Sequence, residues 1–455
     1  MLHHAAVGGS LELWGGVECT VNRVGHRYHD QLRFAGHGSR PDDLEAIASL
    51  GVKALRYPVL WEHVAPRALT QARFDRTDRQ LAALRRLRVE PIVGLLHHGS
   101  GPRYTSLLDP AFPNKLASYA SRVARRYPWL ERFTPVNEPL TTARFSALYG
   151  HWYPHARDDR SFARALFNQV RGSALAMQAI RREIPGAKLV QTEDLGVVRS
   201  TPDLAEQAQF ENHRRFLSLE LLMGRVTRHH PLFDYLRGAG LTERELALLA
   251  DEPCVPDVVG FNYYVTSERF LDSRVELYPS HVIGGNGERQ YADVEAVRVC
   301  RDGLSGPAAL LREAHERLGL TLAITEAHLA GCPEDRARWF SYVWTAAEAA
   351  RQSGVPVVAV TAWALFGSYG WDHLVTRGAC SYEPGAFQVR NRRRIETPYA
   401  GFLRAIAGGT ARVVDGGWWR HDERLLYRHT DALTGTSLAS ADSEQSVVES
   451  CLARL

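Results

Sequence analysis

Two glutamates, each placed at the end of a short apolar run, could together cleave a glycosidic bond. Glu138 follows the run 134–137, and Glu326 follows the run 322–325 much further along the chain. A retaining glycosidase needs one carboxylic acid that protonates the departing oxygen and one carboxylate that attacks the anomeric carbon, about 5 to 5.5 Å apart. Glutamates at the ends of two different strands of a barrel can supply such a pair.

The elements that would position this pair alternate between short β-rich runs and longer amphipathic segments. The predicted strands are 11–15, 53–58, 91–96, 133–137, 188–193, 257–263, 322–325 and 357–363. Apolar residues recur every three or four positions in 41–50, 75–87, 114–127, 162–183, 205–222, 308–318 and 334–353, which predicts helices. Eight such units predict an α/β fold, a closed (β/α)8 TIM barrel. An open doubly wound sheet is disfavoured, since neither GxGxxG nor a P-loop is present.

The domain organisation follows from where this pattern weakens. We expect one large barrel domain over 1–410 and a C-terminal tail over 411–455 that is peripheral or partly disordered, because its end is polar. The segment 266–301, after the sixth strand, is too long for a simple connection and predicts a surface loop that acts as a lid or subsite wall. Gly284-Gly285-Asn286-Gly287 is interpreted as a turn within it.

Composition narrows the classes of partner and site. The 55 basic residues are scattered among 51 acidic ones and form no basic stripe, which argues against nucleic acid. The six cysteines show no metal-ligand spacing, as expected of reduced thiols, so no metal site is predicted. No apolar stretch is long enough to cross a bilayer and the N-terminus lacks a signal pattern. We therefore expect a soluble cytoplasmic protein without a membrane partner.

Other strand ends carry groups that could surround the two glutamates. Arg56 could keep a neighbouring glutamate ionised by lowering its pKa, or could form a purely structural ion pair. His97, followed by His98, ends the third strand and could donate to a sugar hydroxyl. Asn137 directly precedes Glu138, where its amide could bond the sugar 2-hydroxyl.

The sixth and eighth strands add an amide and three aromatic rings. Strand alternation would turn Asn262 and Tyr264 to the same side, where the tyrosine hydroxyl could orient the nucleophile. Trp363 and Trp371 offer aromatic faces that suit pyranose rings, and core packing would explain them equally well.

Five motifs in sequence order resemble the family 1 glycoside hydrolases, the β-glucosidase-type retaining enzymes, over about 11–409. They are Trp14-Gly15-Gly16, Leu55-Arg56-Tyr57, Asn137-Glu138-Pro139, Asn262-Tyr263-Tyr264 and Ile324-Thr325-Glu326. The resemblance implies that Glu138 is the general acid and base and that Glu326 is the nucleophile. It implies the following further roles: Arg56 and Tyr264 as electrostatic partners of the nucleophile, Asn137 as the 2-hydroxyl ligand, His97 as a sugar-binding histidine, Trp363 at the base of the glycone pocket, and Asn22 in place of the family's glutamine.

The chain also departs from that family's pattern. Gly370 stands where the family has a glutamate that clamps the 4- and 6-hydroxyls, and His98 stands in the place of a tryptophan. Either Glu18, Glu193 or Asp372 supplies the missing carboxylate, or the glycone is a modified or 6-deoxy sugar. A 6-phospho-sugar is less favoured because the chain lacks the lysine-bearing loop of the family members that bind such sugars. Loss of a hydroxyl partner weakens discrimination between sugars.

Two hypotheses of different classes follow. The first is a retaining β-glycosidase or transglycosidase that acts on a carbohydrate or glycoside through a covalent glycosyl ester on Glu326, without metal or organic cofactor. The alternative is a catalytically silent carbohydrate-binding or interaction module, associated with a sugar-metabolising enzyme. The altered loop at Gly370 favours the module, whereas the retained set around Glu138 and Glu326 favours the enzyme.

Overall fold

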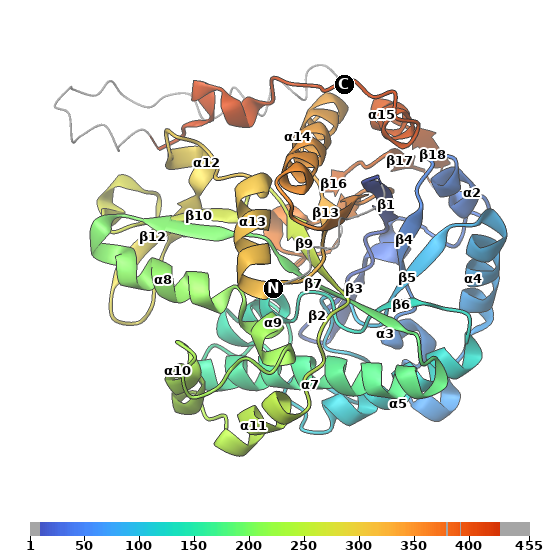
Figure 1. The fold of residues 1–455 in the computed structure, drawn as a ribbon, viewed down its shortest axis with the longest axis horizontal. Helices are drawn as coiled ribbons and strands as arrows, with labels where there is room; N and C mark the ends of the chain where they lie inside the picture. The colour runs from blue at the N-terminus through green and yellow to red at the C-terminus, as the bar shows by residue number, and fades with distance from the viewer. Residues whose placement is uncertain (1–9, 379–380, 392, 428–455) are drawn as a thin grey trace.

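Eight parallel strands close into a barrel in the computed structural model, which describes residues 10–378, 381–391 and 393–427 (Figure 1). The strand order is β1-β14-β13-β9-β7-β6-β5-β4. Their bounds are β1 (Glu12–Gly16), β4 (Ala54–Pro58), β5 (Glu90–Gly94), β6 (Arg132–Thr134), β7 (Lys188–Asp194), β9 (Val258–Tyr263), β13 (Leu322–Ala327) and β14 (Val357–Ala362). Each predicted strand forms one barrel strand, so the predicted TIM barrel is confirmed.

Helices surround the barrel on the outside (Figure 1). They are α1 (Gln31–Phe34), α2 (Asp43–Ala48), α3 (Trp61–Val64), α4 (Asp75–Leu87), α5 (Phe112–Arg126), α6 (Pro139–Ala143), α7 (Asp159–Glu183), α8 (Ala205–Arg214), α9 (Leu217–Leu222), α10 (Phe233–Gly238), α11 (Glu243–Asp251), α12 (Ala296–Val299), α13 (Pro307–Leu318), α14 (Pro333–Gln352) and α15 (Pro398–Ala407). The single helix predicted over 205–222 is two helices, α8 and α9. The chain bends between them, where the buried ring of Phe216 lies under the guanidinium of Arg317.

The barrel interior changes from apolar to polar along the strands. The inward-facing residues of one layer form a small apolar cluster of Trp14, Ala54, Ile92, Val190, Ala323 and Ala359. Because side chains alternate along a strand, residues two positions further on face the same interior nearer the C-terminal end of the barrel. These include Arg56, Thr192, Thr325 and Thr361, all buried and polar. The strands thus place polar groups at the barrel end where such folds carry their active sites.

The segment 266–301, predicted to be a long surface loop, instead contains regular strands. This segment contains β10 (Glu268–Asp272), β11 (Ile283–Gly285) and β12 (Gln290–Glu295), which join β8 (Val197–Ser200) in a four-stranded sheet. Buried Tyr278, Ala292 and Val294 belong to a small core of its own. The strands are short, and β10 pairs with β8 from a distant part of the sequence, so periodicity gave little signal. Of the predicted glycine-rich turn, Gly284 and Gly285 belong to β11, and only Asn286 and Gly287 lie in the turn to β12.

Short two-stranded ribbons complete the described strands. They are β2 (Val21–Val24) with β3 (Arg27–Asp30), β15 (Ser368–Tyr369) with β16 (Tyr382–Glu383), and β17 (Phe387–Arg390) with β18 (Arg393–Glu396). Among the described residues, no helix has both the length and the apolar character needed to cross a membrane.

The first part of the predicted tail packs on the outside of the barrel. Trp419 is buried, with its ring centroid 4.9 Å from that of Trp339 on α14. Arg424 is also buried and donates to the carbonyl oxygens of Val297 and Arg301 at 3.2 and 2.7 Å. The rest of the tail, 428–455, lies outside the described residues.

Candidate active site

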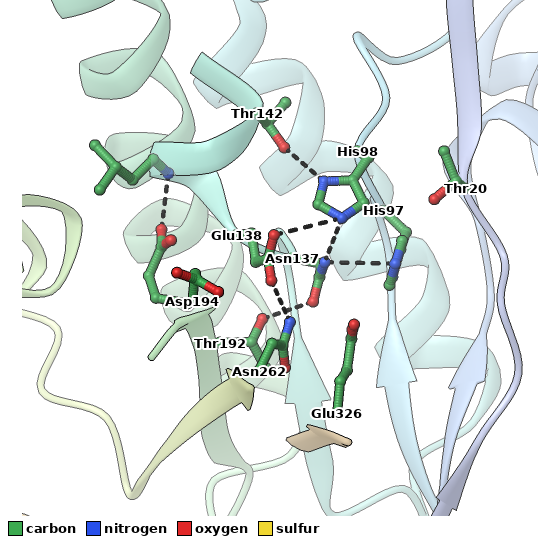
Figure 2. Close-up of polar contacts among 12 residues, drawn as sticks. Thr20, His97, His98, Asn137, Glu138, Thr142, Thr192, Asp194, Asn262 and Glu326 are labelled. Carbon is green, nitrogen blue, oxygen red and sulfur yellow. Dashed lines mark hydrogen bonds and ion pairs between the residues drawn. The ribbon is translucent and has the colours of Figure 1, made fainter. Parts of the chain in front are cut away.

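Glu138 and Glu326 lie at the C-terminal end of the barrel, and both are buried, with 5% and 3% of their surface exposed. Figure 2 shows them within one group of buried polar side chains. The pairing of β13 with β9 shifts register between Ile324 and Glu326, and such an irregularity re-aims a side chain. Glu138 adopts a left-handed φ of 44° directly before α6, a conformation that costs energy and is concentrated at functional sites.

Glu326 is held by a cation and a hydroxyl. Arg56 Nη1 donates to Glu326 Oε1 at 2.6 Å, and the Tyr264 hydroxyl donates to Oε2. Burial raises the pKa of Glu326 to about 7, while the Arg56 guanidinium and the Tyr264 hydroxyl lower it against that effect. These two partners favour the ionised form, which a nucleophile requires.

Glu138 has different neighbours. Asn262 Nδ2 donates to Glu138 Oε1. Burial raises the pKa of Glu138 well above its usual range, and the negative charge of Glu326 raises it further. Both effects favour the protonated form of Glu138, the form that a general acid requires. Asn262 on β9 and Tyr264 directly after it both bond one of the two glutamates, in agreement with the predicted alternation.

Asn137 lies between the two carboxyl groups and two histidines. Its Oδ1 accepts from Arg56 Nη2 at 2.5 Å and from Thr192 Oγ1 at 2.8 Å. Its Nδ2 lies 3.4 Å from His97 Nε2 and 3.2 Å from His98 Nε2. Both ends of the amide are thus bonded within the protein, which fixes its orientation beside the site (Figure 2).

Trp363 packs against the same group of side chains. Its ring stacks on His97 with centroids 5.4 Å apart and planes 9° apart, and the Arg56 guanidinium lies 4.8 Å from its ring centre. A Cβ atom at Gly16 would lie only 2.3 Å from the Trp363 ring. Glycine at position 16 therefore lets this ring reach the barrel end, which explains the second glycine of the Trp-Gly-Gly motif.

The loop after β14 places Trp371 beside Glu18. Gly370 has a left-handed φ of 70° and leads into a short 3₁₀ turn. Trp371 Nε1 donates to Glu18 Oε2 at 3.2 Å, and Glu18 is buried. Burial raises the pKa of Glu18. Asn22, the predicted replacement for the family's glutamine, instead donates its amide to the carbonyl oxygen of Val375 at 3.0 Å.

The three carboxylates considered as replacements at Gly370 occupy very different places. Glu193 points out of the barrel interior, where its Oε1 accepts from Leu140 N at 2.7 Å and Ser218 Oγ at 2.8 Å. Asp372 has a side chain that is 55% exposed. Glu18 is buried next to Trp371 and close enough to Glu326 to raise the pKa of that carboxyl group. Of the three, Glu18 is therefore the carboxylate that lies close to Glu326.

Three polar residues of the site were not predicted. Thr192 and Asp194 follow Val190 on β7 at two-residue spacing, and that alternation was the available signal. Thr142 lies on α6, one helical turn after Glu138, and bonds His98. Within the described ranges, no group of three or more His, Cys, Asp or Glu is arranged to hold a metal ion.

Comparison with known proteins finds a family and similar folds. The model of the family described as glycosyl hydrolase family 1 matches residues 35–307. Beta-glucosidase A of Thermotoga maritima is 23% identical over 228 residues, which is 47% of this chain and 51% of that protein. The match therefore spans about half the length of this relative.

Solved structures extend the similarity over most of the fold. A beta-glucosidase from Thermotoga maritima in complex with azafagomine superposes with a TM-score of 0.71 at 18% identity, covering 89% of this chain and 99% of that one. The family 1 b-glucosidase from the same organism gives a TM-score of 0.71 at 18% identity, with 88% and 98% covered. At this level of identity the likeness establishes the fold.

Proposed function

The chain belongs to glycosyl hydrolase family 1, and from this premise we propose that it is a retaining β-glycosidase that forms a covalent glycosyl ester on Glu326. The observation that carries the proposal is the unequal surroundings of two buried glutamates. Glu326 has the Arg56 cation and the Tyr264 hydroxyl, whereas Glu138 has an amide donor and carboxylate neighbours that keep it protonated. One residue is thus prepared as nucleophile and the other as acid.

The same geometry supports both halves of the reaction. In the first, Glu138 gives its proton to the departing oxygen while Glu326 attacks the anomeric carbon. The resulting ester removes the negative charge of Glu326, so the pKa of Glu138 falls. Glu138, now a carboxylate, then takes a proton from the incoming water or sugar hydroxyl, and the glycosyl unit leaves Glu326. The acceptor decides between hydrolysis and transfer.

For the glycone we propose a neutral sugar that Glu18 contacts in place of the family's clamping glutamate. Glu18 is buried, bonded to Trp371 and next to the nucleophile, whereas Gly370 carries no side chain. A carboxyl at this position suits hydrogen bonds to sugar hydroxyls. The similarity to a protein named beta-glucosidase makes β-glucosides the first class to test.

Covalent trapping tests this function directly. The protein is incubated with activated 2-deoxy-2-fluoro-β-glycosides of the gluco, galacto, fuco and xylo series, and its intact mass is measured. We expect a mass increase for at least one sugar and none in a folded Glu326→Gln variant. Failure of all four sugars to label well-folded protein would overturn the proposal for these glycones and favour the carbohydrate-binding module.

A further inference from the structure

His98 is enclosed within the site and hydrogen-bonded through both ring nitrogens. Nδ1 lies 3.1 Å from Thr142 Oγ1, and Nε2 lies 3.2 Å from Asn137 Nδ2 (Figure 2). The residue is 5% exposed and has a left-handed φ of 54°. A left-handed backbone conformation costs energy in a residue other than glycine. The surroundings of His98 must therefore hold it in this place.

The neighbours of Asn137 fix which nitrogen of His98 carries the proton. Arg56 and Thr192 both donate to Asn137 Oδ1, so the other end of the amide is its NH2 group. That NH2 group donates towards His98 Nε2, which therefore acts as an acceptor. The proton of the neutral ring lies on Nδ1 and is donated to the Thr142 hydroxyl.

The acceptor nitrogen also faces the candidate general acid. Glu138 Oε2 lies 3.5 Å from His98 Nε2, while Oε1 accepts from Asn262. A neutral ring with a lone pair on Nε2 attracts a protonated carboxyl group and repels a carboxylate. The contact is thus favourable only when Glu138 carries its proton on Oε2, where it can share the Nε2 lone pair with the Asn137 amide.

We propose that His98 is a positioning residue that holds the acid proton of Glu138, its Nε2 accepting a hydrogen bond from the protonated carboxyl group. This inference rests on the proposed function, since it concerns the acid and base of that reaction. In the first half-reaction the proton leaves Glu138 Oε2 for the departing oxygen and His98 stays neutral. In the second half-reaction Glu138 regains a proton from the acceptor and the contact with Nε2 re-forms.

The charged groups around this pair act in the same direction. The carboxyl groups that raise the pKa of Glu138 are Glu326 from β13 and Asp194 and Glu193 from β7, and Arg56 from β4 lies close enough to His98 to lower the pKa of its ring. The negative charges of these carboxyl groups oppose the ionisation of Glu138. Burial and the Arg56 cation lower the pKa of His98 to about 3, so the ring is neutral around neutral pH. The contact between His98 and Glu138 is therefore not an ion pair between a charged imidazolium and a carboxylate.

Matched variants separate this role from simple packing. His98→Phe keeps a planar ring but has no acceptor, whereas His98→Gln keeps a carbonyl acceptor near the position of Nε2. We expect His98→Phe to move the basic limb of the kcat/KM profile down by about one pH unit, the scale of one lost hydrogen bond to the neutral acid. His98→Gln should restore most of that shift. Thr142→Val, which releases Nδ1, should give a smaller shift in the same direction.

A uniform loss of activity in His98→Phe with an unmoved basic limb would overturn the proposal, because packing alone would explain it. Substrates with a good leaving group provide a second test that distinguishes the positioning role from packing. The first half-reaction of an aryl glycoside with a strongly acidic phenol needs little help from a general acid. The defect of His98→Phe should therefore shrink with such a substrate.

A measurement that needs no activity keeps this inference separate from the proposed function. Selective ¹⁵N labelling of histidine, with His98→Gln for assignment, reports the tautomer of His98. We expect a neutral ring protonated at Nδ1 between about pH 5 and 8, and an Nε2 shift that titrates with Glu138 and no longer does so in Glu138→Gln. Protonation at Nε2, or an Nε2 shift that ignores Glu138, would overturn the inference even if trapping on Glu326 succeeds.

Discussion

The floor and the wall of the candidate site are built in different ways. The floor consists of Arg56, Asn137, Glu138, Asn262 and Glu326, and the wall consists of Glu18, Gly370 and Trp371. Floor residues lie on or directly after barrel strands and are buried and bonded to one another. Wall residues lie in the segments after β1 and β14, and one of them has no side chain.

This difference indicates that the wall can change in sequence while the floor is kept. A buried carboxylate without its partners is costly, and removing one member of a buried pair is strongly destabilising. The floor residues are therefore constrained together, because replacing one of them leaves its buried partners unpaired. Loops above a barrel tolerate replacement because few backbone hydrogen bonds depend on them. A family member can thus keep its chemistry while its choice of sugar changes.

The largest expected effect comes from removing the floor's acid. Glu138→Gln keeps the shape of the side chain but cannot give up a proton. We expect kcat/KM for an alkyl β-glycoside to fall by about a thousandfold, within the range of a lost general acid. For an aryl glycoside with a good leaving group, the loss should be much smaller and the glycosyl enzyme should accumulate. Steady-state rates on both substrates test this, and equal losses on the two would argue against the acid role.

A smaller effect is expected from the cation that supports the nucleophile. With the pKa of Glu326 raised to about 7, kcat/KM should decline as the pH falls below about 7, because the nucleophile takes up a proton. Arg56→Gln removes the group that favours the anion, so the acid limb should move to higher pH. We expect a loss of at least about tenfold at pH 6 that narrows at pH 8. If the acid limb were unchanged in Arg56→Gln, titration of Glu326 would not be the cause of that limb.

The smallest effect should follow from the wall. Glu18→Gln should raise KM for the preferred glycone by about tenfold with a modest change in kcat, as expected for one lost hydroxyl contact. Asp372→Asn is the matched control, since its side chain is largely exposed and away from Glu326, and should change neither constant. If Asp372→Asn altered the preference among gluco, galacto and fuco substrates instead, the replacement carboxylate would be Asp372.

Much of the floor could be predicted from the sequence because it follows from strand patterns. Glu138 and Glu326 each end an apolar run, and the alternation of Asn262 and Tyr264 is a property of any extended strand. The wall could not be predicted in the same way. Gly370 was evident as a departure, and the alternation along β7 that turns Thr192 inward turns Glu193 outward, but nothing local showed that Glu18 and not Asp372 lies close to Glu326.

The sequence by itself determined the eight-fold alternation of strand and helix, and with it the barrel and the end at which polar side chains gather. The local spacing of apolar residues suffices for this, because each strand and helix must bury its own apolar face. Only the tertiary structure decided which polar groups meet. The β10-β8 pairing, the hydrogen bond from Leu140 N to Glu193 and the contact of His98 with Glu138 all join residues distant in the chain. Such contacts depend on the closure and register of the whole barrel, which no local stretch of sequence specifies.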